Sequence, residues 1–225
     1  GNRFFSLPNI HDPSSNTHHS RKMKIICIGR NYADHITELN NERPSEPVIF
    51  LKPETAVVLK KFPFVIPEFS QDVHHEVEVL VKINKVGKYI EPKFAHKYYD
   101  EIGLGIDFTA RDVQSRLKEK GLPWEKAKAF DGSAIISDFL PKKDFSSMEN
   151  ITFELTNNGQ LVQSGNTNLM LWKIDEIIAY VSKYFTLKKG DIIFTGTPKG
   201  VAAVKEGDVL EGFLEGKSMF KLKVK

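Results

Sequence analysis

The sequence predicts a strand-dominated mixed α/β fold, with a rolled or barrel-like sheet and few helices. Short apolar or alternating segments, which are typical of strands, far outnumber segments with apolar residues at helical spacing. Several strand segments follow one another closely along the chain, as they do in antiparallel hairpins. Because strands outnumber helices, we do not expect a doubly wound sheet, in which the two alternate.

The strands are predicted from apolar runs and from alternation with a period of two residues. In chain order they are residues 24–29, 48–51, 55–59, 77–83, 102–108, 152–155, 161–163, 191–194, 209–214 and 219–224. Between 152–155 and 161–163 lies the pair Asn158-Gly159, which favours a tight turn. These two strands are therefore expected to form a hairpin.

Helices are predicted at residues 31–39, 110–120 and 169–185. The second is marked by Thr109 and Asp112 at the spacing of a capping box, and by Gly121 as a stop. The third carries apolar residues at helical spacing, and Asn168 can cap its first turn. Its apolar stripe predicts a helix packed on the core.

The composition is that of an ordinary globular protein, with 40% hydrophobic and 27% charged residues in 225. The formal charge of +3 is spread along the chain, so no nucleic-acid partner is expected. No apolar stretch has the length of a membrane span, and no membrane partner is expected either. The single cysteine, Cys27, lies in an apolar run and is expected in the core. It suits a reducing compartment, and we expect a cytoplasmic location.

Residues 1–22 differ from the rest of the chain because they are polar and show no strand or helix period. They lack the apolar region of a secretory signal. We expect an N-terminal extension or an added leader at 1–22, followed by one catalytic domain at 23–225.

Three acidic residues point to a metal site. Alternation in the run His-His-Glu-Val-Glu-Val places Glu76 and Glu78 on one face of a strand. Asp107 stands alone in an apolar run, where an ionised carboxylate is costly without a cation or hydrogen-bond donors. Each signal alone also fits a solvated strand face or a buried, hydrogen-bonded acid. Together the three carboxylates offer the hard oxygen ligands that suit Mg²⁺ or Mn²⁺ rather than zinc.

A second group of candidates lies on the first predicted helix and on a glycine-rich turn. His35 and Glu38 are three residues apart, so the carboxylate can orient the imidazole as a general base, although an exposed surface pair has the same spacing. With the polar loop 40–47, this helix is expected to form a mobile lid. The turn at 195–200 offers amides and the Thr197 hydroxyl to a carboxylate, although a plain tight turn has the same sequence.

Taken together, these motifs resemble the fumarylacetoacetate hydrolase superfamily, and in particular its small single-domain acylpyruvases and oxaloacetate decarboxylases. The stretches that carry the resemblance are residues 29–35, 50–53, 74–78, 107–114, 121–124 and 195–200. They occur in the family's order and at plausible spacing.

The resemblance implies a β-rich fold and a homodimer with one divalent metal ion per subunit. It implies that Glu76, Glu78 and Asp107 bind Mg²⁺ or Mn²⁺, and that His35 and Glu38 form a catalytic pair on the lid. Lys128 is implied as a further catalytic residue that also holds substrate. The remaining residues that match substrate-binding motifs are Arg30, Lys52, Arg111, Gln114 and Thr197.

The expected reaction is cleavage of a carbon–carbon bond in a small 2-oxo acid, through a pyruvate enolate bound to the metal. Hydrolysis of an acylpyruvate is placed first, with His35 and Glu38 deprotonating the attacking water. Decarboxylation of oxaloacetate is an alternative, as is isomerisation of a 2-hydroxy-diene-dioate or of oxaloacetate tautomers, because both pass through a similar enolate. A non-catalytic binding protein that has kept the fold is the alternative from a different class.

Overall fold

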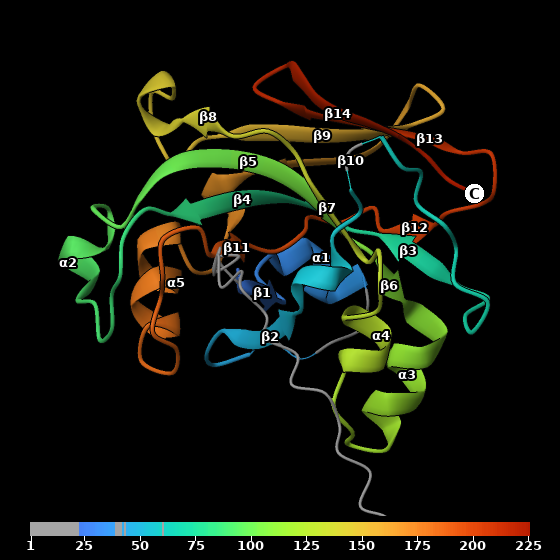
Figure 1. Cartoon of the computed structure of the whole chain (residues 1–225), viewed down its shortest axis with the longest axis horizontal. Coiled ribbons are helices and arrows are strands. Elements are labelled where there is room, and N and C mark those ends of the chain that lie inside the picture. Colours follow the sequence, from blue (N-terminus) through green and yellow to red (C-terminus); the bar gives the residue numbers. More distant parts are fainter. Residues whose placement is uncertain (1–22, 39–41, 43, 60) are drawn as a thin grey trace, which may run out of the picture.

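Three sheets form the framework, and in the largest the long strands between residues 77 and 107 arch over the first strands of the chain, which belong to the same sheet (Figure 1). The computed structural model describes residues 23–38, 42, 44–59 and 61–225. The predicted extension at 1–22, and residues 39–41 and 43 of the predicted lid, lie outside the described residues.

The largest sheet has seven strands, and five of its residues line the pocket described below: Ile28, Gly29, Phe50, Glu78 and Asp107. Its strand order is β2 (Val48–Lys52), β1 (Ile25–Gly29), β11 (Ile192–Phe194), β4 (Val77–Ile83), β5 (Tyr99–Asp107) and β7 (Ala134–Ile136), with β8 (Leu140–Pro141) also pairing with β5. Strands β1 and β11 run parallel, whereas the other neighbours are antiparallel. The prediction of a strand-dominated, curled sheet that is not doubly wound is confirmed.

Two smaller sheets complete the framework. The four-stranded sheet has the order β10 (Gln160–Asn166), β9 (Thr152–Asn157), β13 (Val209–Leu214) and β14 (Lys217–Lys223). The three-stranded sheet consists of β12 (Ala202–Ala203), β3 (Val73–His75) and β6 (Thr109–Ala110). Strands β9 and β10 form the predicted hairpin, and Asn158 and Gly159 both take positive φ, at 52° and 80°. A two-residue turn of this kind matches the twist of the strands it joins.

The helices are short and lie beside the sheets. They are α1 (Ala33–Glu38), α2 (Pro92–Ala95), α3 (Arg111–Glu119), α4 (Glu125–Lys128) and α5 (Ile174–Val181), with 3₁₀ turns η1 (Glu54–Ala56), η2 (Lys142–Asp144) and η3 (Thr167–Leu169). Helices α3 and α4 contact each other below β6, and α5 packs against α2 at the opposite side (Figure 1). Among the described residues, no helix has the length and apolar character needed to cross a bilayer.

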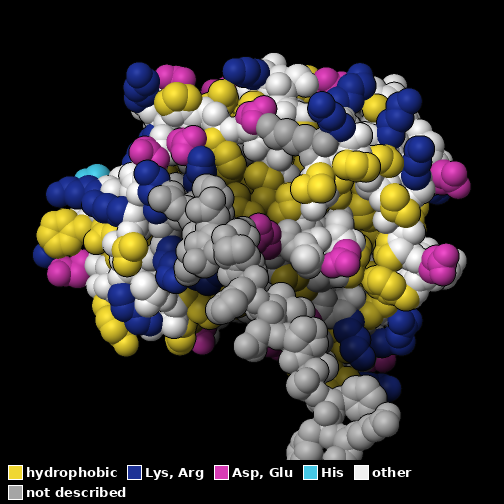
Figure 2. Space-filling model, viewed as in Figure 1, with side chains coloured by type: hydrophobic (Ala, Val, Ile, Leu, Met, Phe, Trp, Pro, Cys, Tyr) yellow, Lys and Arg dark blue, Asp and Glu magenta, His cyan; other side chains and the backbone are white. Residues whose placement is uncertain are grey.

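Strand β4 divides its side chains between two clusters, as its alternation predicts. Val77 and Val79 enter the main hydrophobic core, whereas Leu80 packs with Cys27 and Phe194 in a second cluster. Cys27 is fully buried, which confirms the role expected from its apolar run. On the face seen in Figure 2, basic and acidic side chains are interspersed around the hydrophobic ones.

The third predicted helix is wrong at both ends, because the structure has α5 only from Ile174 to Val181. The stretch before α5 is bonded instead to Asn31. The Asn31 side-chain oxygen accepts from the Trp172 backbone N–H at 2.8 Å, and its backbone oxygen accepts from Leu171 N–H at 2.9 Å. Asn168 lies in η3 and does not cap α5; the N-cap is Lys173. Tertiary hydrogen bonds have replaced the helical ones here.

The predicted capping box of the second helix is also wrong. The N-cap of α3 is Ala110, and no side chain caps it. The Thr109 hydroxyl donates to the Glu76 carboxylate at 3.0 Å, while Asp112 accepts from the Ser70 hydroxyl at 2.6 Å. Both side chains therefore bind partners from distant segments, which local spacing does not reveal.

The predicted strand at 55–59 is absent from the described residues. This segment begins with the 3₁₀ turn η1, in which the backbone N–H of Ala56 donates to the Pro53 carbonyl at 3.0 Å. Val57 keeps only an isolated bridge to Ala134. The proline sets the turn, because its fixed φ is compatible with a tight 3₁₀ turn and it has no N–H for a sheet.

Candidate active site

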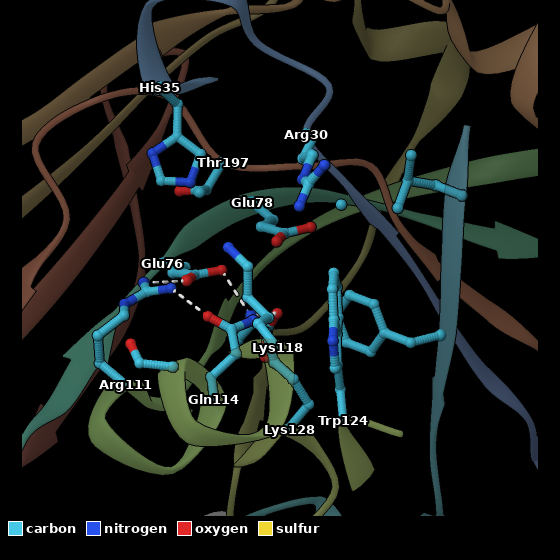
Figure 3. A pocket seen from close by; sticks show the side chains of 15 residues that line it. Arg30, His35, Glu76, Glu78, Arg111, Gln114, Lys118, Trp124, Lys128 and Thr197 are labelled. Carbon is cyan, nitrogen blue, oxygen red and sulfur yellow. Dashed lines mark hydrogen bonds and ion pairs between the residues drawn. The ribbon is translucent and has the colours of Figure 1, made fainter. Parts of the chain in front are cut away.

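Three buried carboxylates line one pocket, and Figure 3 shows two of them, Glu76 and Glu78. Glu76 comes from the break between β3 and β4, Glu78 from β4, and Asp107 from the end of β5. One oxygen atom of each side chain lies within 4.8 Å of the others. The antiparallel pairing of β4 with β5, which sets Val77 against Ile106, explains why residues distant in sequence converge. The predicted metal-ligand residues are thus brought together.

The surroundings push the ionisation of these acids in opposite directions. Burial, followed by the charges of Asp107 and Glu76, raises the pKa of Glu78 well above its usual value. Burial also opposes ionisation of Glu76, but the charges of Lys128 and Arg111 outweigh it and hold the pKa of that carboxyl well below its usual value. Within the described part of the chain, Glu78 forms no direct ion pair, whereas Glu76 pairs with Arg111 and Lys128, so a bound cation would compensate Glu78.

Two buried lysines, Lys128 and Lys52, form ion pairs with these acids. Lys128 Nζ lies 2.8 Å from Glu76 Oε2 and 2.7 Å from Asp107 Oδ2. Although burial opposes its charge, Asp107 and Glu76 raise the pKa of Lys128, so it stays an ammonium ion. Lys52 Nζ lies 2.7 Å from Asp107 Oδ1 and also donates to the Ser133 carbonyl at 3.1 Å. Lys52 does not line the pocket, and it holds Asp107 from behind.

The imidazole of His35 faces the carboxylates from α1, on the same side of the pocket as Thr197 (Figure 3). Its Nδ1 lies 3.2 Å from Glu38 Oε2. The Glu38 carboxylate in turn accepts from the Gly200 backbone N–H at 3.0 and 3.2 Å. The predicted pair therefore exists, and the turn after β11 holds it in place.

Asn31 links the start of this helix to the same turn. Its side-chain Nδ2 donates to the Thr195 carbonyl at 2.8 Å, and it is almost fully buried. Beside it, Gly196 has a φ of 106°, and its backbone N–H donates to Glu78 Oε2 at 2.7 Å. A side chain at Gly196 would meet the Asn31 Cβ at 2.7 Å. The turn thus contacts both the acids and the predicted lid.

Helix α3 and the segment after β1 supply the cationic wall. Arg111 donates to the Gln114 side-chain oxygen at 2.7 Å and also to Glu76 Oε1. Arg30 lines the opposite side with a φ of 58°, an uncommon conformation for a residue with a side chain. Lys118, from the last turn of α3, reaches the same pocket (Figure 3).

Of the eleven residues predicted for the site, nine line this one pocket: Arg30, His35, Glu76, Glu78, Asp107, Arg111, Gln114, Lys128 and Thr197. The other two, Glu38 and Lys52, contact lining residues from outside. The pocket also contains six residues to which the sequence assigned no site role: Ile28, Gly29, Phe50, Ser115, Lys118 and Trp124. Phe50 and Trp124 form a tilted ring pair at 6.1 Å, and Lys128 lies over the Phe50 ring. Both aromatic residues fall in stretches that carry the family resemblance, 50–53 and 121–124, although the sequence assigned them no role.

The acids fit a hard divalent ion. All three are carboxylates, and no cysteine lies among the pocket residues. Burial and repulsion between the acids raise the pKa of Glu78, and a bound cation would offset both. Glu76, Glu78 and Asp107 would hold Mg²⁺ or Mn²⁺, and each keeps a partner from the protein: Thr109, Gly196 and Lys52, respectively. Such partners fix the orientation of metal ligands.

Comparisons with known proteins agree with this site. The family model for the fumarylacetoacetate hydrolase C-terminal domain matches residues 24–224. The chain is 45% identical to a mitochondrial oxaloacetate tautomerase of Bos taurus over 89% of this chain and 90% of the relative. It is 44% identical to a mitochondrial oxaloacetate decarboxylase of Dictyostelium discoideum, over 86% and 89% of the two chains.

A solved structure also matches along most of its length. The fumarylpyruvate hydrolase of Pseudomonas aeruginosa, in complex with Mn²⁺ and pyruvate, superposes with a TM-score of 0.85 at 33% identity. The match covers 90% of this chain and 89% of that one. The alternative of a non-catalytic binding protein is not supported, because these relatives are enzymes along the whole matched length. The chain belongs to the fumarylacetoacetate hydrolase family and is an enzyme of that family.

Proposed function

We propose that this enzyme interconverts the keto and enol forms of oxaloacetate, or of a closely similar 2-oxo dicarboxylate, with Mg²⁺ or Mn²⁺ at its carboxylate site. The observation that carries the proposal is the placement of His35 opposite three buried carboxylates in one pocket. A base facing a metal site suits removal of a proton beside a carbonyl group. The bovine relative is named an oxaloacetate tautomerase, and this supports placing tautomerisation ahead of hydrolysis.

The charge of the pocket favours a substrate with two carboxylates. Four cationic side chains line it beside the three acids: Arg30, Arg111, Lys118 and Lys128. Burial, together with the charges of Arg30 and Arg111, lowers the pKa of Lys118, which indicates how closely these cations are grouped. With a divalent ion present, the positive charges outnumber the negative ones, so a dianion is attracted more strongly than a monoanion.

The chain's own residues can carry out the proton transfer. A bound divalent ion would stabilise negative charge on the 2-oxo oxygen. In enolisation, His35 would take the proton from carbon 3 and deliver it to the 2-oxo oxygen, and in the reverse direction it would carry the proton back to carbon 3. Glu38 keeps Nδ1 engaged and leaves Nε2 for the transfer. Tautomerisation moves one proton between carbon 3 and the 2-oxo oxygen while the double bond shifts between C=O and C=C, so no bond between heavy atoms is broken.

Hydrolysis of an acylpyruvate is the second candidate. His35 and Glu38 would deprotonate a water molecule as readily as a carbon acid, and the Pseudomonas neighbour is named a fumarylpyruvate hydrolase. Decarboxylation of oxaloacetate uses the same residues, and the Dictyostelium relative carries that name. These reactions differ in which bond breaks, so their products distinguish them.

The test is to give the purified enzyme enol-oxaloacetate or acetylpyruvate with Mg²⁺, and to repeat each assay with a chelator. Loss of the ultraviolet absorbance of the enol, without release of pyruvate, supports tautomerisation. Release of pyruvate and CO₂ from oxaloacetate supports decarboxylation instead, and release of acetate from acetylpyruvate supports hydrolysis. If Mg²⁺ accelerates none of these reactions, the proposed function is wrong.

We further propose a homodimer in the cytoplasm. The dimer rests on the family resemblance, and sedimentation equilibrium of the purified protein would test it. The free, buried Cys27 suits a reducing compartment. Because the bovine relative is named as mitochondrial, fractionation of cells that make this protein is the deciding measurement for its location.

A further inference from the structure

Gln163 is a buried polar residue to which the proposed reaction gives no role. It lies in β10, next to an irregularity in the pairing of β10 with β9, and is only 1% exposed. Its amide group bridges the start of β4, which carries Glu78, to the turn that carries Thr197. Four hydrogen bonds surround it, so its orientation can be worked out from its partners.

The backbone groups around Gln163 fix which way its amide points. The N–H of Val77 can only donate, and it lies 3.1 Å from Gln163 Oε1. The carbonyl of Pro198 can only accept, and it lies 3.0 Å from Gln163 Nε2. The two ends agree, so the oxygen faces β4 and the NH₂ group faces the turn. His75, whose Nδ1 lies 2.9 Å from Oε1, is then the donor in that bond.

This orientation determines the role of the Thr197 hydroxyl. Gln163 Nε2 lies 2.9 Å from Thr197 Oγ1 and donates to it, so the hydroxyl oxygen is the acceptor of this bond. The hydroxyl proton must then point in another direction. Since Thr197 lines the pocket close to His35 (Figure 3), that proton is available to a ligand there.

We propose that Gln163 is a positioning residue: it makes Thr197 a hydrogen-bond donor toward an anionic oxygen of the bound 2-oxo acid. A carboxylate oxygen can only accept, so a fixed donor favours it over ligand groups that donate. Gln163 itself does not touch the ligand. The inference rests on the proposed function only for the class of ligand.

The test is a double-mutant cycle that measures the Kd of pyruvate by titration calorimetry in saturating Mg²⁺. The variants are Gln163→Met, Thr197→Val and the two combined. We expect Thr197→Val to raise the Kd about tenfold and Gln163→Met about three- to tenfold, because hydrogen bonds to charged groups are among the stronger ones. Once Thr197 is valine, Gln163→Met should add less than about twofold, because the hydroxyl that it orients is gone.

Two controls separate this role from a general loss of structure. Gln160→Met makes the same change at an exposed position of the same strand, and it should leave the Kd of pyruvate unchanged. The Kd of Mg²⁺ should stay within about twofold of that of the parent in all variants, because the metal ligands are untouched. If Gln163→Met does not fold, Gln163→Glu replaces it: the ionised side chain still accepts from Val77 but cannot donate to Thr197, and a loss of at least the same size is expected.

The outcomes distinguish this inference from the proposed function. Independent, multiplicative effects of the two substitutions, or an unchanged Kd in the Gln163 variants, would overturn the inference alone. If the parent enzyme binds Mg²⁺ but not pyruvate, the inference is overturned, whereas the proposed function is decided separately by turnover of enol-oxaloacetate.

Discussion

At the scale of single residues, the three acids of the pocket differ in how far the protein compensates their charge. Glu76 and Asp107 are neutralised by the buried Lys128, whereas Glu78 accepts only from the Gly196 backbone N–H among the hydrogen bonds of the described residues. A backbone amide compensates a carboxylate less than an ammonium ion does. Glu78 is thus the acid with the most to gain from a bound metal ion.

Glu78→Gln is therefore the sharpest test of the metal site. The raised pKa means that Glu78 tends to be protonated without metal, and glutamine resembles that neutral acid. We expect the metal-free protein to keep its melting temperature, while Mg²⁺ affinity falls more than about 100-fold, beyond the usual effect of changing a partner of a ligand. Titration calorimetry measures this, and Glu119→Gln, at an exposed position of α3, is the matched control. Normal Mg²⁺ uptake by Glu78→Gln would remove the acid from the ligand set.

The raised pKa of Glu78 also predicts how the stability of the fold depends on pH. An acid whose pKa is raised by folding binds more protons in the folded state, so its contribution to stability is lost as pH rises through the folded pKa. Bound Mg²⁺ needs the carboxylate, so its affinity should rise over the same pH range. Thermal denaturation at a series of pH values, with and without Mg²⁺, checks both signs. Stabilisation by Mg²⁺ that is larger at low pH would contradict the prediction.

His35 is expected to act on the substrate and not on the metal. His35→Ala should leave the Kd of Mg²⁺ unchanged, because the imidazole is bonded to Glu38 and not to the acids. Its kcat for tautomerisation should fall about 10²- to 10⁴-fold, the usual contribution of a general base. Stopped-flow absorbance of enol-oxaloacetate measures the rate, and His96→Ala, at an exposed position, is the control. A parent-like kcat in His35→Ala would exclude this base.

At the scale of elements, the turn after β11 determines whether the catalytic pair is formed. Gly200 has a φ of 97°, and a Cβ there would meet the Val162 carbonyl oxygen at 2.3 Å. Its N–H holds Glu38, which orients His35. The glycine is required for both reasons, since only glycine adopts this φ readily and leaves room for the neighbouring strand.

Gly200→Ala should consequently displace the turn and the base together. We expect kcat to fall about 10- to 100-fold, because a shift of about 1 Å in a catalytic group has effects of this size. Gly207→Ala is the matched control: its φ of 93° is as unfavourable for alanine, but nothing lies within 4 Å of the added Cβ. Comparing the kcat of the two variants separates the collision from the backbone strain. Equal losses of kcat would mean that strain alone is responsible.

Elements with strong local patterns were predicted from the sequence, and those set by distant partners were not. The predicted strand at 77–83 matches β4, and the hairpin at Asn158-Gly159 was found, because alternation and turn residues are local signals. The start of α5 was predicted wrongly because the backbone before it donates a hydrogen bond to Asn31, which is far away in the sequence. Thr109 was expected to cap a helix, but its hydroxyl is drawn to a buried carboxylate.

At the scale of the whole molecule, the sequence led to the site but not to its arrangement. The acids and the base were recognised from their motifs. The order of strands in the large sheet, however, depends on pairings such as that of β1 with β11, which are far apart in the sequence. Lys52 matched a substrate-binding motif but lies behind Asp107. Motifs identify the residue types near a site, whereas only the packing decides which of them reach the ligand.

The fold also brings cationic side chains from separate elements to the pocket, and this predicts a preference among substrates. Lys118 is exposed at the end of α3 and joins Arg30 and Arg111 there. We expect Lys118→Met to raise KM for the dianion oxaloacetate about two- to fivefold, a modest effect because the charge is solvated and screened. The KM for monoanionic acetylpyruvate should change less, and Lys120→Met, which removes an exposed charge outside the pocket, should change neither. Because the attraction is electrostatic, the difference in KM for oxaloacetate between Lys118→Met and the parent should shrink as the salt concentration rises. Equal effects on both substrates would show that Lys118 does not distinguish their charges, and the argument for a dicarboxylate would then rest on Arg30 and Arg111.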